Sequence, residues 1–540
     1  MTVNRRVAAL AAVSAVTLTL ASCASSDRED SAGASGSGGG GDTITFGAAG
    51  APAMFDPFYG TDGETFRPAR QIFETLVDFK PGTADLAPGL ATKWTPSNGG
   101  KTWTFDLQQN VKFTDGTAFN ADAVCKNFTR MFDQNAAGQT AASYWADNMG
   151  GFKSKGAAEA LYKSCTPKGA NQVVIDINRP TSKFPALLGL PSFSMQSPTA
   201  MDKYKANNIT PQGDGYTYSE YALKYPTGTG KFKLEKYDEA NKTITMVRND
   251  DYWGDKAKPA RLVFKIIPDE TARKQALAAG TIDGYDLPNP VDWPKLKQDE
   301  NLQIRPAFNL LYLGLNPKAN PDLKDLKVRQ ALMYGINRDQ FVKTQLPENA
   351  VVATQWIPKD VDGFNKDVTK YNYDPNKAKQ LLQQAGKTGT TVRLRLPSLP
   401  YAQSCGPVVK SMLEQVGFKV QTDTLEFPAA WLTTVFTNSD YDLSMVSHVE
   451  PRDLPTVFGD PDYYTHFSNP QMAGLLKAAD TGTPQQETAS MKKAARLIAD
   501  DAGADFLFLL PNLIVADKNI TGLPKNAITE GFDLASLGRS

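Results

Sequence analysis

The chain has 540 residues, which is too long for one ordinary domain and long enough for two well-buried cores. Lysine plus arginine and aspartate plus glutamate each number 58, so no net field favours nucleic acid or an anionic membrane surface. Any partner must therefore be recognised by a local group of residues rather than by overall charge.

The N-terminus has the pattern of a lipoprotein signal peptide. Two arginines at positions 5 and 6 precede a mainly apolar run, residues 7–20, and Leu20-Ala-Ser-Cys23 is a small-residue cleavage site that ends in cysteine. A retained membrane-spanning helix, the alternative, would need roughly 18 or more apolar residues. We therefore expect a signal peptide over residues 1–22 and lipidation of Cys23, whose acyl chains anchor the protein on the membrane.

A segment rich in Ser, Gly and Asp follows over residues 23–42, and its composition predicts a disordered tether. Strands and helices then alternate in the pattern of the chain. The predicted elements of the first half are a strand at Thr43–Phe46, a helix near Arg67–Val77, a strand at Thr102–Leu107, a helix capped by Asn120, a strand at Gln172–Asn178, a hairpin of Lys231–Tyr237 and Lys242–Val247, a strand at Arg261–Ile267 and a helix at Glu270–Ala279.

The second half continues the α/β pattern. Its predicted elements are an extended apolar run at Phe308–Asn316, a helix at Val328–Ile336, a helix after Asp374-Pro375, a strand–helix–strand unit of Thr391–Leu396, Pro407–Val416 and Gly417–Thr422, a helix at Ala489–Ala499 and a strand at Phe506–Leu510. The strand–helix–strand unit predicts parallel pairing within an α/β sheet.

Four stretches carry a resemblance to a known family. They are K-T-W-T-F-D-L-Q-Q-N-V-K-F-T-D-G-T-A-F-N-A-D-A-V at Lys101–Val124, G-T-G-K-F-K-L at Gly228–Leu234, R-N-D-D-Y-W-G at Arg248–Gly254, and I-I-P-D-E-T-A-R-K-Q-A-L-A-A-G-T-I-D at Ile266–Asp283. In these stretches the chain resembles the extracytoplasmic solute-binding proteins of peptide- and nickel-type ABC importers, family 5. The resemblance covers nearly all of residues 43–540.

The resemblance implies an α/β, two-lobed, periplasmic-binding-protein-like fold with mixed sheets, hinge connections and an extra subdomain in the first lobe. The expected domains are a first lobe at 43–307 with an inserted subdomain near 83–210, a second lobe at 308–505, and a return to the first lobe at 506–540. Residues 136–169, rich in Ala, Gly and Ser, look like an insertion relative to shorter relatives and receive no functional assignment.

Cysteine usage predicts one disulfide. Lipidation of Cys23 leaves three cysteines in a compartment where disulfides persist. Cys125 and Cys165 both lie in one segment of the expected first lobe and form the predicted pair. Cys405 would then be a free thiol.

Catalytic motifs are missing from the sequence. The chain has only two histidines, His448 and His466, and no G-x-S-x-G elbow, H-E-x-x-H helix or Walker-type loop. The glycine pair Gly228 and Gly230 lacks the third glycine of a dinucleotide loop and is interpreted as a turn before a strand. The sequence therefore predicts a protein that is not an enzyme and that carries no cofactor; a secreted hydrolase is the competing class.

The expected ligand-binding residues lie mainly in the second lobe. The resemblance implies a strand near residues 440–445 that leads to the cleft, where peptide-binding relatives place an acidic residue against the ligand's α-amino group. Asp453 and then Glu450 are the candidates for that acid, and Arg452 is a candidate for a carboxylate. The alternative for each is an ordinary surface ion pair.

Further candidates for the cleft are Phe55 and Asp56, on the loop after the first strand, and Trp431 and Tyr463; the alternative for these is plain packing. His448 invites a metal interpretation because nickel-type relatives can hold a metal chelate with a histidine. One imidazole is a weak signal, so no metal site is assigned.

The predicted function is that of a lipid-anchored receptor on the extracytoplasmic face of the cell membrane. It would capture a short peptide between two lobes, as a monomer, and deliver it to the permease subunits of an ABC transporter, without contact to nucleic acid. The alternatives are a binding protein for nickel or another metal chelate, haem or an oligosaccharide, and a secreted hydrolase.

Overall fold

The structure is a computed structural model, and it describes residues 43–540 apart from positions 82, 84, 182, 214, 305–308, 346–349, 360, 449–452, 511–512 and 525–531. The predicted signal peptide, the lipidated Cys23 and the tether lie outside the described residues. Residues 41–540 form one compact unit. Within the described part of the chain, no helix combines the length and the apolar character that crossing a membrane requires.

A seven-stranded mixed sheet contains the first strand of the described chain. Its order is β10-β11-β12-β1-β13-β21-β14, with β1 parallel to β12 and β13 and the hairpin β10–β11 antiparallel. The strands are β1 (Thr43–Ala48), β10 (Phe232–Asp238), β11 (Thr243–Arg248), β12 (Arg261–Ile266), β13 (Gly284–Asp286), β14 (Asn301–Ile304) and β21 (Leu513–Ala516). The hairpin and the strand at β12 confirm the alternation predicted from the sequence.

A four-stranded antiparallel sheet is built from residues inserted between β1 and β10. Its order is β4-β5-β7-β6, and its strands are β4 (Ala91–Ser97), β5 (Thr102–Leu107), β6 (Tyr162–Pro167) and β7 (Gln172–Ile177). A disulfide joins Cys125 on α2 (Ala121–Phe132) to Cys165 on β6. Cys405 is free and buried. The pairing therefore stands as the sequence predicted.

A six-stranded mixed sheet contains the later half of the chain. Its order is β16-β20-β15-β19-β17-β18, with β17 parallel to β18 and β15 antiparallel to both β19 and β20. The strands are β15 (Asn309–Leu315), β16 (Val351–Val352), β17 (Thr391–Pro397), β18 (Lys419–Leu425), β19 (Leu443–His448) and β20 (Ala504–Leu510). The parallel β17–α13–β18 unit confirms the predicted strand–helix–strand unit.

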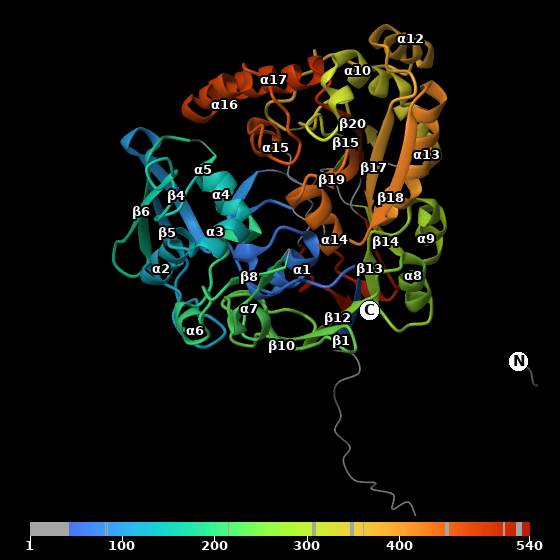
Figure 1. Cartoon of the computed structure of the whole chain (residues 1–540). Helices are drawn as coiled ribbons and strands as arrows, with labels where there is room; N and C mark the ends of the chain where they lie inside the picture. Colours follow the sequence, from blue (N-terminus) through green and yellow to red (C-terminus); the bar gives the residue numbers. More distant parts are fainter. Residues whose placement is uncertain are drawn as a thin grey trace, which may run out of the picture. The chain divides into compact units, whose positions relative to one another are not determined.

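Both faces of this sheet are buried, and β15 shows why. Leu311 and Leu313 pack into a core with α10, α12 and α13, while Leu310 and Tyr312 pack into a second core with α15 and α17. Successive side chains of a strand point to opposite faces, so a strand between two cores must be apolar throughout. Figure 1 shows α10, α12 and α13 together beside this sheet.

The chain crosses between the two larger sheets twice. It passes from β14 to β15, and it returns from β20 to β21. The sequence placed the return at residue 506, but Phe506–Leu510 belongs to β20, which pairs with β15, so the predicted boundary comes one strand too early. We therefore propose a first lobe of residues 43–304 and 513–540 and a second lobe of residues 309–510.

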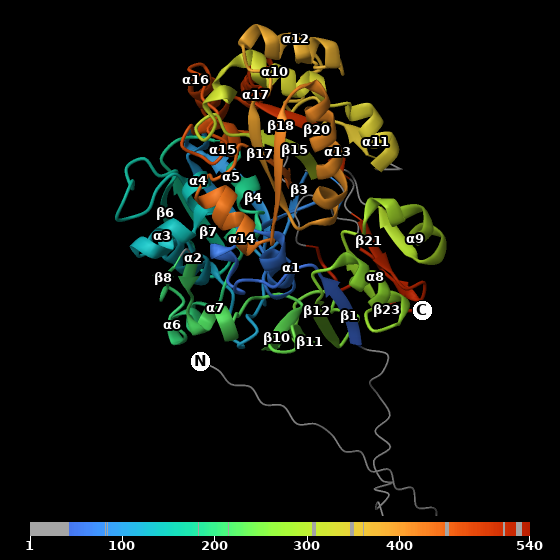
Figure 2. The ribbon, with the colours of Figure 1, turned by 45° about the vertical axis from the view of Figure 1, so that its right-hand side comes forward.

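Helices of the first lobe are α1 (Gly63–Ile72), α2, α3 (Ala136–Ala141), α4 (Ser143–Met149), α5 (Phe184–Leu187), α6 (Pro198–Lys203), α7 (Glu220–Lys224), α8 (Glu270–Ala278) and α9 (Trp293–Asp299). Helix α8 contacts β13 and α9 contacts β14, and Figure 2 shows both helices beside β21 of the same sheet. Helices of the second lobe are α10 (Leu326–Gly335), α11 (Arg338–Gln345), α12 (Pro375–Ala385), α13 (Pro400–Val416), α14 (Ala429–Trp431), α15 (Leu454–Gly459), α16 (Met472–Thr481) and α17 (Pro484–Asp500).

The remaining strands form three short pairs, and short helical turns fill several connections. The pairs are β2 (Val77–Phe79) with β3 (Leu86–Pro88), β8 (Thr210–Gln212) with β9 (Gly215–Thr217), and β22 (Ile520–Thr521) with β23 (Gly538–Arg539). The turns include η1 (Pro57–Tyr59), which follows Asp56, and the π-helical η6 (Leu432–Thr437), which continues α14.

Candidate functional site

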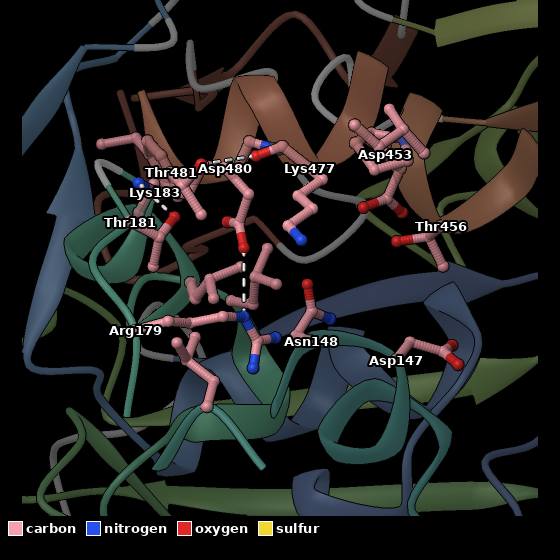
Figure 3. Close-up of a pocket in the computed structure, with 17 residues that line it drawn as sticks. Asp147, Asn148, Arg179, Thr181, Lys183, Asp453, Thr456, Lys477, Asp480 and Thr481 are labelled. Atoms are coloured by element: carbon pink, nitrogen blue, oxygen red, sulfur yellow. Dashed lines mark hydrogen bonds and ion pairs between the residues drawn. The ribbon is translucent and has the colours of Figure 1, made fainter. Parts of the chain in front are cut away.

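A cavity of about 480 Å³ lies between the first and second lobes. Residues of α4, the segment after β7, and α5 form its wall on the first lobe, while α15 and α16 form its wall on the second. Figure 3 shows Asp147 and Asn148 of α4 on one side, with Asp453, Thr456 and Lys477 opposite. Such a concave space between two lobes is the commonest setting of a ligand site.

A smaller cavity of about 110 Å³ adjoins the first. Both cavities are lined by Asp147, Asn148, Asp453 and Thr456, so these four residues stand where the two spaces meet. Aromatic rings from both lobes line the smaller cavity: Phe66 of α1, Tyr144 of α4, and Phe427, Trp431, Phe436, Tyr463 and Tyr464 of the second lobe.

The meeting point of the two cavities is acidic. Asp147 lines the cavity from α4, and its side chain keeps access to solvent there. Desolvation first, and then the negative charges of Asp453 and Asp460, raise the pKa of Asp147 to about 7. Asp453 immediately precedes α15, and its Oδ2 lies 2.9 Å from Nε2 of His448, at the end of β19. An acidic group from each lobe therefore reaches the same place.

Basic side chains lie toward the other end of the larger cavity. Arg179 of the first lobe forms an ion pair with Asp480 of α16, with 3.2 Å between Nε and Oδ2, and its Nη1 donates to the carbonyl oxygen of Glu159 at 2.9 Å. Lys477, also on α16, is exposed, and Figure 3 shows its amino group directed into the cavity. Lys183 belongs to the same lining. The cavity thus has an acidic end and a basic end.

Four of the residues predicted from the sequence meet at this site. Asp453, His448, Trp431 and Tyr463 all line the smaller cavity, and Asp453 lines the larger cavity too. Trp431 is nearly buried, and its Nε1 donates to Oγ of Ser444 at 3.3 Å. Glu450 and Arg452 lie outside the described residues, so their relation to the cleft stays a prediction.

Phe55 and Asp56 lie elsewhere, and neither lines these two cavities. Phe55 is 1% exposed and packs edge to face on Tyr237. Asp56 is fully buried, forms an ion pair with Arg130, and accepts hydrogen bonds from the Phe58 amide and the Gln196 side chain. Because both side chains are already committed to packing and to local hydrogen bonds, we leave them out of the proposed site.

Several cleft residues escaped the sequence analysis. Asp147 and Asn148 belong to the Ala/Gly/Ser-rich segment that received no function, and Arg179, Lys477 and Phe436 carry no motif. An acidic residue in the last turn of a short helix is an ordinary surface pattern, so only the fold reveals that α4 faces α15. Among the described residues, no three His, Cys, Asp or Glu side chains cluster as a metal ion would require.

The fold and the cleft define a class of protein before any relative is considered: two α/β lobes, joined by two crossings, enclose a polar cavity suited to a small ligand. Residues 85–469 match the profile of the bacterial extracellular solute-binding proteins, family 5. The chain belongs to this family, whose members are solute-binding proteins and not enzymes.

Individual relatives agree with this assignment. The chain is 33% identical to the dipeptide-binding protein of Escherichia coli over 404 residues, 71% of this chain and 72% of the relative. It is 31% identical to haem-binding protein A of Haemophilus influenzae over 354 residues, 64% of this chain and 62% of the relative. Among solved structures, an ABC transporter-associated periplasmic binding protein from Helicobacter pylori, in complex with the peptide STSA, superposes with a TM-score of 0.78. That comparison has 25% identity and covers 92% of this chain and 98% of the other.

Proposed function

We propose that this protein captures a short peptide between its two lobes and delivers it to the permease of an ABC transporter. The observation that carries the proposal is the pair of carboxylates, Asp147 and Asp453, which enter the cleft from opposite lobes where its two cavities meet. The names of the relatives support it: one is a dipeptide-binding protein and another was solved with a tetrapeptide.

The free amino group of a peptide suits this acidic point. An ammonium ion paired with carboxylates in a cleft shielded from water makes strong, charge-assisted hydrogen bonds. The ammonium would touch Asp453 on one lobe and Asp147 on the other, so its binding would favour the closed arrangement of the lobes. Contacts to a terminal charge do not depend on side chains, which suits a receptor for varied peptides.

The decisive experiment is isothermal titration with a matched pair of peptides, one with a free amino group and one N-acetylated. Removing one partner of a buried charge pair costs on the order of 3–5 kcal/mol, so acetylation should weaken binding by about two to three orders of magnitude. Asp453→Asn should weaken binding of the free-amine peptide to a similar extent. Asp133→Asn serves as the control, because Asp133 lines neither cavity and pairs with Lys153 within the first lobe.

Other results would redirect the proposal. If both Asp453→Asn and Glu450→Gln bind the free-amine peptide normally, the second lobe does not supply the amino-group anchor. If no di- to hexapeptide gives heat while a nickel chelate, haem or an oligosaccharide does, the ligand is not a peptide.

The finer part of the proposal concerns location. We propose that the protein acts as a monomer on the extracytoplasmic face of the cell membrane, held there by acyl chains on Cys23 after removal of residues 1–22. The support for the anchor is the signal-peptide pattern of residues 5–20 and the cleavage site that ends in Cys23.

Replacement of Cys23 by alanine tests the anchor. The Cys23→Ala protein should leave the membrane fraction and fail to incorporate radiolabelled palmitate, while the wild type keeps both properties. A Cys23→Ala protein that stays with the membrane to the same extent would refute the lipid anchor without touching the ligand assignment.

A further inference from the structure

The smaller cavity is lined largely by aromatic rings, whereas charged groups mark the two ends of the larger cavity. We call it the aromatic pocket and define it by Phe66, Tyr144, Phe427, Trp431, Phe436 and Tyr463. Phe427 and Trp431 approach within 6.0 Å, ring centre to ring centre, and Phe436 meets Tyr463 edge to face at 5.5 Å. The rings come from both lobes, so an occupant would contact the two lobes at once.

Two of the charged groups around the aromatic pocket, Asp62 and His448, already have partners within the protein. Both carboxylate oxygens of Asp62 accept from Thr65, Oδ1 from the amide and Oδ2 from the hydroxyl, each at 2.9 Å. Burial raises the pKa of Asp62 and so disfavours its charged form. Nε2 of His448 lies against Asp453. What the pocket offers an occupant is therefore mainly ring surface, which favours an apolar side chain over a lysine or arginine.

The position of the pocket sets the register of a ligand. The ammonium group, the side chain and the carbonyl carbon of a peptide's first residue all branch from one α-carbon. With the ammonium between Asp147 and Asp453, two spaces open from that point, one of about 110 Å³ and one of about 480 Å³. The smaller space fits one side chain, and the larger fits the rest of a short peptide, whose carboxylate would reach the basic end at Lys477.

We propose that the aromatic pocket is a specificity subsite that selects peptides whose first residue has a large apolar side chain. This inference rests on the proposed function, because it needs a ligand with a free amino group at the acidic point. It goes beyond that function by making the receptor selective at one ligand position. The second and third side chains face the larger space, where no comparable enclosure by rings exists among the described residues that line it.

Three tripeptides of matched composition test the subsite by isothermal titration: Leu-Ala-Ala, Ala-Leu-Ala and Lys-Ala-Ala, with Ala-Ala-Ala as reference. Burying the leucine side chain in an apolar pocket should make Leu-Ala-Ala bind roughly thirtyfold more tightly than Ala-Ala-Ala. Ala-Leu-Ala and Lys-Ala-Ala should stay within about threefold of the reference, since neither fills the pocket with apolar surface.

Two matched variants place the effect in the aromatic pocket. Ser143 lines only the smaller cavity and Thr481 only the larger, and both are accessible side chains. Ser143→Trp should fill the aromatic pocket and reduce the preference for Leu-Ala-Ala to about onefold, while Ala-Ala-Ala still binds. Thr481→Trp should weaken all four peptides and keep the roughly thirtyfold preference. Phe436→Ala is a second test of the pocket. Loss of one ring should reduce the preference for Leu-Ala-Ala severalfold without blocking the cleft.

Each remaining outcome has a clear meaning. A wild type that binds all four peptides equally, or that prefers Ala-Leu-Ala or Lys-Ala-Ala, overturns the subsite and leaves the proposed function standing. So does a Ser143→Trp protein, folded by its thermal unfolding curve, that keeps the full preference for Leu-Ala-Ala. A wild type that binds none of the peptides overturns the proposed function itself.

Discussion

Asp147 is poised to make ligand capture depend on pH. Desolvation and the nearby charges of Asp453 and Asp460 raise its pKa to about 7, so at neutral pH about half of the ligand-free molecules carry it protonated. A bound ammonium favours the ionised carboxylate and lowers this pKa. Affinity should therefore rise with pH between about 5 and 8, by at most roughly tenfold per pH unit, with proton release on binding. Above about 8, deprotonation of the ligand's own α-amino group should reduce the affinity again.

The Asp147→Asn variant checks this prediction in titrations from pH 5 to 9. Its amide cannot ionise, so the rise in affinity over the acid range should disappear, and binding at pH 8 should be weaker than in the wild type. Asp460→Asn should keep the rise but move it to lower pH, because removing a like charge lowers the pKa of Asp147. If Asp147→Asn retains the wild-type profile, the acid dependence belongs to another group.

The sequence predicted site residues on the second lobe but missed those on the first lobe, because local patterns do not show which distant segments meet. Asp453, His448, Trp431 and Tyr463 fall within one short stretch of the second lobe, and the resemblance to the family directed attention there. Asp147 reaches the same point from a helix some three hundred residues earlier, which local patterns do not encode. Phe55 and Asp56 sit on a loop of the expected kind, yet Asp56 turns inward to Arg130. Residue type predicts what a side chain can do, whereas packing decides where it points.

At the scale of elements, the boundaries of two helices are the clearest errors of prediction. The sequence placed a helix near Arg67–Val77, but α1 runs over Gly63–Ile72, with Asp62 as N-cap and Pro68 inside. It also began a helix at Pro407, whereas α13 starts at Pro400 and contains Pro407. Proline is best tolerated in the first turn of a helix, yet Pro68 and Pro407 lie inside α1 and α13. In both helices, packing of an apolar face outweighs the lost backbone hydrogen bond.

The glycine pair of the family motif at Gly228–Leu234 is explained by packing between elements. A β-carbon on Gly228 would lie 2.2 Å from the carbonyl oxygen of Ile72, and one on Gly230 would lie 2.6 Å from that of Gln71. The approach to β10 therefore runs directly against the end of α1, and only glycine leaves room for it. The interpretation of Gly228 and Gly230 as a turn before a strand, and not a nucleotide loop, agrees with this contact.

The disulfide ties α2 to β6, and its removal should destabilise the first lobe. Cys125 and Cys165 are 40 residues apart, so the cross-link should contribute roughly 3–4 kcal/mol through the entropy of the unfolded chain. Denaturant unfolding of a Cys125→Ser/Cys165→Ser protein should show this loss in the free energy of unfolding. A difference below about 1 kcal/mol would mean that native strain cancels the entropic gain.

Thiol counting provides an independent check, made in a Cys23→Ser background. The sequence predicts a free thiol at Cys405; the structure has it free but buried in α13, and burial raises the pKa of the thiol. We therefore expect negligible labelling of the folded protein, one thiol after unfolding without reductant, and three after reduction. Three thiols in the unfolded protein before reduction would show that the disulfide had not formed.

At the scale of the whole molecule, the two-lobe arrangement was predictable and its exact crossing was not. The block order and the family motifs indicated two α/β lobes, and the two larger sheets confirm a mixed-sheet fold of that kind. The second crossing was placed at Phe506 because the apolar run Phe506–Leu510 resembles the family's return strand to the first lobe. Hydrogen-bond pairing decides the matter: β20 pairs with β15, and β21 pairs with β13 and β14. The composition of a strand does not determine which distant strand it pairs with.

One ion pair spans the cleft and links the two lobes directly. Arg179 follows β7 in the first lobe, and Asp480 lies on α16 in the second; their side chains are 41% and 29% exposed. A partly exposed pair of this kind contributes at most about 1 kcal/mol, which corresponds to roughly fivefold in a rate or an affinity. Because the pair exists only while the lobes are together, we expect it to slow ligand release rather than to speed capture.

Asp480→Asn should therefore raise the dissociation rate of a bound peptide by about two- to fivefold, measured by stopped-flow displacement, with little change in the association rate. The difference from the wild type should shrink as salt rises from about 0.05 to 1 M, since the pair is open to solvent. Asp133→Asn is the matched control, because the exposed Asp133–Lys153 pair lies wholly within the first lobe. If the two variants release the peptide equally fast, or if the effect of Asp480→Asn persists at high salt, the pair across the cleft does not hold the lobes closed.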